Sequence, residues 1–140
     1  MTAATAVGHM ADLVVRLVGR RLGAQLHADA AGVGRVVVPD RDLRYHLDLA
    51  CGQVRRFGRD EPTVLTAVLG MLRDVAVACR DDAQRAEVAR AAQLTAEELP
   101  PQAARTDTEV VADMHRRVEL ALAGDVDAAY ADRAGETRSI

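Results

Sequence analysis

Apolar residues recur at three- and four-residue intervals along most of the chain, and this spacing predicts a mostly α-helical fold. The first such segment covers residues 3–22 and is expected to end at Gly23. Its apolar side chains span an arc of about 200° on a helical wheel, wider than the stripe of a one-sided surface helix. We therefore expect this helix to be covered from two sides.

A different pattern follows at about residues 24–38, where two short apolar runs flank a turn. Gln25, Leu26 and His27 form the first run, and residues 35–38 form the second. The residues between them include Asp29 and Gly32, which favour a turn, so the segment predicts a small β-hairpin. Because a lone two-stranded hairpin is only marginally stable, we expect it to pack against the helices.

The remaining helices are predicted from their caps, apolar stripes and stop signals. They are expected from Asp40 or Asp42 to Phe57, from Asp60 and Pro62 to about Cys79, from Asp81 to about Leu99, from a Thr106–Glu109 capping box to Leu122, and, as a short last helix, from an Asp125 cap after Gly124. The expected buried residues are Leu47, Val54, Leu65, Leu69, Leu72 and Val118. The sequence thus predicts a single-domain bundle of five to six helices over residues 1–132, followed by a polar tail at 133–140.

Charge is distributed unevenly along the chain and limits the classes of function. All 18 basic residues are arginines; residues 1–60 hold nine of them against six acidic residues, and residues 61–140 hold nine against 15. Neither half has the basic excess of a nucleic-acid-binding domain, and an aromatic content of 2% leaves few platforms for stacked bases. We therefore expect no nucleic-acid partner.

The cysteines and the uncharged runs bear on the compartment. Cys51 and Cys79 lie far apart in sequence, with no CxxC motif and no secretory leader, which favours a reducing cytoplasm. The longest uncharged run, around residues 64–71, is too short to span a bilayer, so no direct membrane insertion is expected.

Residues 48–58 (DLACGQVRRFG) and the following Asp60, Glu61 and Pro62 read as a family signature. With residues 5–7 (TAV) and 36–39 (VVVP), this segment resembles the C-terminal soluble region of an uncharacterised family of predicted bacterial membrane proteins. The resemblance implies several preceding membrane helices, a further helix, and a turn with Ser-Pro-Gly and Asn-Asp-Pro motifs, all expected to be missing here because Met1 falls just before Thr5. It implies no reaction.

Four arginines on or beside the helix at 41–58 form a candidate binding surface for a ligand or partner. Arg44 and Arg55 project opposite the apolar stripe, and Arg56 and Arg59 lie close by. Guanidinium groups bind carboxylates or phosphates with paired hydrogen bonds, so this surface suits an anion or an acidic partner. The simpler interpretation is a solvated helix face with an Arg44–Asp48 pair.

Two histidines suggest a different function. His46 and His115 lie at the edges of the apolar stripes of their helices, where two half-buried imidazoles can share one pocket. With Tyr45, they are the candidate catalytic residues of a small biosynthetic-type enzyme. Boundary histidines more often have a structural partner instead, and no zinc or calcium spacing occurs, so no metal or cofactor is expected.

Taken together, the sequence favours a cytoplasmic helical interaction or ligand-binding domain, with histidine acid–base catalysis as the alternative and a structural oligomerisation module as a third option. The binding surface of this domain for a protein partner would be the arginine-bearing helix and the hairpin. A small molecule, however, is expected in a cavity shared by His46 and His115 rather than on the arginine face. We also expect a homodimer or other homo-oligomer. Its interface would use the first helix, whose Val7, Val14, Val15 and Val18 would otherwise form an exposed apolar patch.

Overall fold

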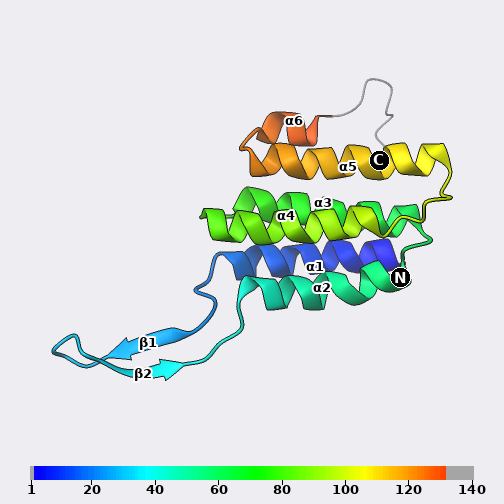
Figure 1. Cartoon of the computed structure of the whole chain (residues 1–140). Helices are drawn as coiled ribbons and strands as arrows, with labels where there is room; N and C mark the ends of the chain where they lie inside the picture. The colour runs from blue at the N-terminus through cyan, green and yellow to red at the C-terminus, as the bar shows by residue number, and fades with distance from the viewer. Residues whose placement is uncertain (1, 132–140) are drawn as a thin grey trace.

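The computed structural model describes residues 2–131, which form six helices and one two-stranded hairpin (Figure 1). The elements are α1 (Ala3–Val18), β1 (Gln25–Ala28), β2 (Gly34–Val38), α2 (Leu43–Phe57), α3 (Pro62–Ala78), α4 (Asp82–Glu97), α5 (Arg105–Leu122) and α6 (Val126–Tyr130). The predicted fold class, a mostly α bundle with a hairpin after the first helix, is confirmed. The expected tail at 133–140 lies outside the described residues.

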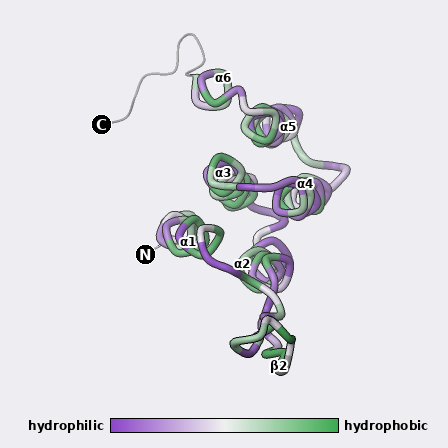
Figure 2. The backbone as a smooth tube through the Cα atoms, turned by 90° about the vertical axis from the view of Figure 1, so that its left-hand side faces the viewer, coloured by the Kyte–Doolittle hydropathy of each residue, from purple (hydrophilic) through white to green (hydrophobic). Residues whose placement is uncertain are grey.

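The helices stack in three layers, α1 with α2, α3 with α4, and α5 with α6 (Figure 2). The central helix is α3, which packs against α1, α2, α4 and α5. Its apolar residues cover most of its circumference, and a helix that is apolar nearly all round must be buried. Of the predicted core residues, Leu47, Leu65, Leu69, Leu72 and Val118 are fully buried, and Val54 is partly buried.

Aspartate caps fix three of the helix starts as the sequence predicts. The Asp42 carboxylate accepts the Tyr45 N–H at 2.9 Å and begins α2, and Asp81 accepts the Gln84 N–H at 2.8 Å and begins α4. Asp125 does the same for α6. Each cap satisfies a backbone donor that a helix leaves unpaired in its first turn.

Two predicted boundaries are wrong. The first helix ends at Val18, four residues early, and Gly23 lies beyond it in the loop with a φ of 86°, its N–H donating to the Arg41 carbonyl. The predicted capping box at Thr106 does not form, because α5 already begins at Arg105. There Glu109, the acid of the expected box, pairs instead with Arg105 at 2.8 Å.

The valines of α1 are covered within the chain. Val7, Val14 and Val18 are buried and Val15 is partly buried, because α1 packs against both α3 and α2. The wide apolar arc therefore has cover on two sides, as its width predicts. The expected exposed valine patch is absent, however, so the dimer prediction loses its premise, although the oligomeric state itself stays a prediction.

The hairpin extends away from the helices at the end of the bundle where α1 stops and α2 starts (Figure 1). Its strands are antiparallel, with Leu26 opposite Val37, and Asp29 closes the turn by accepting two backbone N–H groups at 3.0 Å. The expectation that it packs against helices is wrong: every apolar side chain described in β2 is exposed. The described helices therefore leave the hairpin uncovered.

Candidate anion-binding site

Three segments far apart in sequence meet at the hairpin end of the bundle and enclose an open pocket of about 530 Å³. They are the loop after α1, the first turn of α2, and the turn from α3 into α4. The lining residues are Val18, Arg20, Arg21, Leu22, Gln25, Asp42, Leu43, Arg44, Arg80, Asp81, Ala83, Gln84 and Glu87. We refer to this as the arginine pocket.

Gln84 holds the walls of the arginine pocket together. The side-chain amide of Gln84 donates to the Val18 carbonyl at 3.2 Å. Its side-chain oxygen accepts the backbone N–H of Arg80 at 2.8 Å. The glutamine thus satisfies a carbonyl in the last turn of α1 from the first turn of α4. Arg80 in turn lies over Gly19, where a Cβ would be 3.4 Å from its guanidinium nitrogen.

The arginine pocket has a small net positive charge, because four arginines and three acidic residues line it. Arg20, Arg21, Arg44 and Arg80 are all exposed, and none forms an ion pair with another residue that the structure describes. The three acidic residues of the lining are otherwise engaged: Asp42 and Asp81 cap helices, and Glu87 pairs with Arg90 at 3.0 Å. Four free guanidinium groups around one hollow suit a phosphate or carboxylate.

The four predicted binding arginines are divided by the structure. Only Arg44 lines the arginine pocket. Arg55 pairs with Glu98 on α4 at 3.3 Å, Arg59 lies 4.0 Å from Asp60, and Arg56 is exposed near the C-terminal end of α2. The sequence therefore pointed to one member of the site and did not place the other three there.

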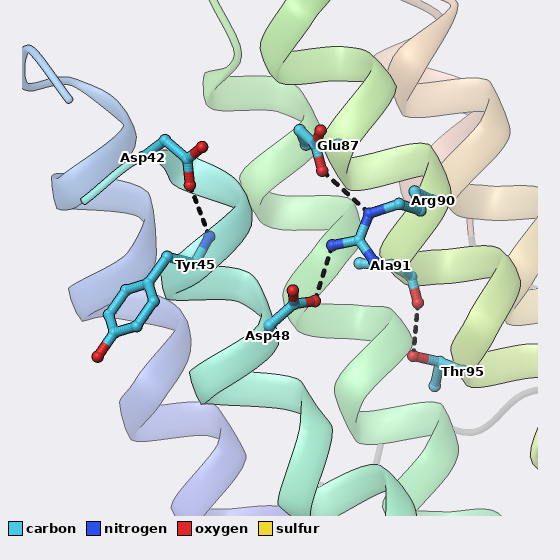
Figure 3. A network of polar contacts seen from close by, with 7 residues as sticks. All are labelled: Asp42, Tyr45, Asp48, Glu87, Arg90, Ala91 and Thr95. Carbon is cyan, nitrogen blue, oxygen red and sulfur yellow. Dashed lines mark hydrogen bonds and ion pairs between the residues drawn. The ribbon is translucent and has the colours of Figure 1, made fainter. Parts of the chain in front are cut away.

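The face of α2 taken from its sequence as an outer surface in fact meets α4. Asp48 accepts a hydrogen bond from Arg90 at 2.7 Å, and Arg90 also binds Glu87 (Figure 3). The hydrogen bond to Asp48 raises the Arg90 pKa. The expected Arg44–Asp48 pair does not form, and this leaves Arg44 available to the pocket.

The sequence did not identify Arg20, Arg21 and Arg80 as candidate binding residues. The available signals were the adjacent pair Arg20 and Arg21 just past the apolar stripe of α1, and Arg80 just before the Asp81 cap. Neither signal is specific, because arginine pairs and flanking charges are common at helix ends. Only the packing of α1, α2 and α4 brings these residues to one pocket.

The candidate catalytic histidines are not brought together. His46 lies on α2 and His115 on α5, both partly buried, in the two outer layers with the α3–α4 layer between them (Figure 2). Each packed layer adds about 8–10 Å between helix axes. Tyr45 contacts the His46 ring edge-on with centroids 5.4 Å apart, and Arg41 lies 4.4 Å from the Tyr45 ring centre.

Both cysteines are buried free thiols. Burial raises the pKa of Cys51 to about 12 and also raises that of Cys79, whose Sγ–H donates to the Val75 carbonyl at 3.3 Å. Thiols with raised pKa values are poor nucleophiles at neutral pH. Residues 2–131 contain no cluster of three or more His, Cys, Asp or Glu side chains arranged to hold a metal ion.

Comparison with known proteins identifies the family of the chain. Residues 1–74 match the family described as "Predicted membrane protein (DUF2254)", which is more than half of the chain, and the chain therefore belongs to this family. The resemblance inferred from sequence is confirmed at this level. Within residues 2–131, however, none of the helices has both the length and the apolar character to cross a bilayer.

The chain is also similar to mycobacterial proteins whose names give no function. Uncharacterized protein Rv1290c of Mycobacterium tuberculosis and Uncharacterized protein Mb1321c of Mycobacterium bovis are each 36% identical to this chain over 87 residues. The aligned segment is 62% of this chain but only 17% of each relative, so the chain corresponds to about a sixth of their length. No solved structure matches.

Proposed function

We propose that this chain is an extramembrane ligand-binding domain of its family, and that it binds the anionic group of a small molecule or partner in the arginine pocket. The observation that carries the proposal is the set of four arginines without ion-pair partners in the described residues, all lining one hollow. The volume of about 530 Å³ falls in the range of small-molecule sites.

The electrostatics of the arginine pocket support an anion over a neutral ligand. Guanidinium groups that share one hollow repel one another, and a bound phosphate or carboxylate removes this repulsion while it accepts charge-assisted hydrogen bonds. The caps at Asp42 and Asp81 occupy first-turn amides of α2 and α4. Recognition would therefore rest on the arginine side chains rather than on helix-end N–H groups.

A cytoplasmic position, corresponding to the soluble part of the family, belongs to the same proposal. Cys51 and Cys79 support it, because both are free thiols, as expected where thiols are kept reduced.

Calorimetric titration of the full chain with inorganic pyrophosphate tests the proposal. We expect saturable binding that weakens as salt increases, and a loss of about tenfold or more in Arg44→Glu combined with Arg80→Glu, since a charged hydrogen bond contributes about 1.5–3 kcal/mol. Arg56→Glu is the matched control, because Arg56 is also exposed on α2 but does not line the pocket. Absence of binding at millimolar pyrophosphate, or an equal loss in the control, would contradict the proposal.

A further inference from the structure

The hairpin presents apolar side chains on both of its faces. Leu26 and Val37 are cross-strand partners and share one face, and Val36 and Val38 lie on the other, because successive strand residues alternate. These four side chains are 44–66% exposed. A hairpin that docks flat on a single protein surface needs only one apolar face, whereas a lipid interface can accept apolar side chains from both faces.

Arginines surround the base of the hairpin. Arg20 and Arg21 precede β1, and Arg41 and Arg44 follow β2. All four are exposed, and among the described residues none has an ion-pair partner. The nearby acids bind backbone amides instead: Asp40 accepts the Arg41 N–H at 2.7 Å, and Asp42 caps α2. The hairpin is therefore an apolar projection with a positively charged base.

We infer that this end of the domain docks on an anionic lipid bilayer, with the hairpin in the interfacial region and the basal arginines on lipid phosphates. The inference rests on the proposed function, because Arg20, Arg21 and Arg44 also line the arginine pocket. Figure 1 shows the hairpin pointing away from the helices, so the bundle does not obstruct its approach to a surface. Amphipathic elements with basic residues bind anionic membranes in this way.

Strand length limits the insertion to the interface. The longer strand, β2, has five residues, and at about 3.3 Å per residue it reaches roughly half the thickness of a hydrocarbon core. The outer edges of both strands also carry unpaired backbone groups, which are costly in hydrocarbon but are hydrated among headgroups. The docking we infer is therefore shallow and does not span the membrane.

The charge of the basal arginines also argues against a second copy of the chain as the partner that covers the hairpin. Two copies joined through their hairpins would bring two sets of basal arginines together, and like charges at an interface oppose association. An anionic bilayer offers the opposite charge next to an apolar layer. Family membership agrees with this choice, since the family consists of predicted membrane proteins.

The chain has no tryptophan, so one introduced tryptophan can report on the hairpin. In the full chain, Val37→Trp should show a blue shift of its fluorescence with vesicles of phosphatidylcholine and phosphatidylglycerol, and none with phosphatidylcholine alone. Val110→Trp is the matched control, because Val110 is an exposed valine on α5 in the far layer. Replacing Arg20 or Arg21 by Ala should weaken vesicle binding about fivefold each, whereas Arg56→Ala should leave it unchanged.

Several outcomes would overturn the inference. One is an unshifted Val37→Trp spectrum with anionic vesicles, and another is an equal shift in Val110→Trp. A third is a blue shift of Val37→Trp without vesicles in a chain of dimeric mass, which would identify a second copy of the chain as the partner that covers the hairpin. The pyrophosphate titration separates the two proposals. Pyrophosphate binding without vesicle binding refutes membrane docking alone, and loss of both refutes the arginine pocket as well.

Discussion

Cys51 illustrates how a single buried side chain is controlled by its surroundings. It lies on α2 against the core, where loss of hydration opposes the thiolate, and the charge of Arg55 only partly offsets this. The thiol therefore stays protonated far above neutral pH and acts as a small apolar residue. The same burial makes the protein sensitive to alkaline conditions.

We expect the free energy of unfolding to fall as the pH rises from about 9 towards 12. The unfolded thiol ionises near 9.0 and the folded thiol near 12, so between these values the unfolded state releases its proton first. This contribution is present below pH 9 and is lost by about 1 kcal/mol per pH unit above it. Urea denaturation at pH 8, 9 and 10 measures the effect.

Cys51→Ala is the control for this prediction, because it removes the ionising group and leaves the Cys79 thiol in place. The variant should be less stable than the natural chain at pH 8, owing to the cavity, but should lose less stability as the pH increases. Identical pH slopes in the two chains would show that Cys51 does not cause the alkaline effect.

Phe57 shows that an apolar pattern does not by itself predict whether a side chain is buried. It lies three residues after Val54, at the spacing of the apolar stripe of α2, and this spacing favours burial. Phe57 is nevertheless 82% exposed, at the last residue of the helix. Periodicity identifies the face of a helix, but the length of the neighbouring elements decides how far along that face the cover extends. Leu47 and Cys51, nearer the middle of α2, are buried.

At the scale of elements, α2 and α4 are joined by ion pairs. Arg90 of α4 binds Asp48 of α2 and also Glu87 (Figure 3). Arg55 of α2 binds Glu98 at the end of α4. The charged face of α2 is thus an internal contact with α4, on the side away from α1.

A double-mutant cycle should find coupling between Asp48 and Arg90. We expect about 0.5–1 kcal/mol from Asp48→Ala and Arg90→Ala, because the pair is short but only partly buried. The Arg105–Glu109 pair on α5, whose arginine side chain is 91% exposed against 27% for Arg90, should give about 0.3 kcal/mol. Urea denaturation of the single and double variants measures both values, and equal coupling in the two pairs would mean that α4 packing does not strengthen the first.

The sequence predicted where helices start better than it predicted which helices pack together. The starts of α2, α4 and α6 were predictable because Asp42, Asp81 and Asp125 act on backbone groups within three residues. Which elements become neighbours was not, since it depends on contacts between distant segments. For the same reason Arg44 was identified as a candidate, while Arg80, 36 positions away, was not associated with it.

At the scale of the whole molecule, the segment that matches the family ends before the hydrophobic core does. The match covers residues 1–74 and ends inside α3, whereas α3 packs on α1 and α2 on one side and on α4 and α5 on the other. Fully buried residues occur on both sides of the match limit, Leu72 before it and Val75 after it. The core therefore requires helices outside the matched segment.

We predict that a chain ending at residue 78 does not fold cooperatively. It would keep α1, α2 and α3 but expose the sides of α3 that α4 and α5 cover, and a helix with uncovered apolar sides is not stable alone. Circular dichroism should show reduced helix content and a broad urea transition. As a control, replacing residues 26–37 of the full chain by Asn-Gly should preserve a cooperative transition, because the hairpin residues removed do not contribute to the core. A sharp transition in the shortened chain would instead mean that the family-matched segment is a folding unit to which α4, α5 and α6 are added.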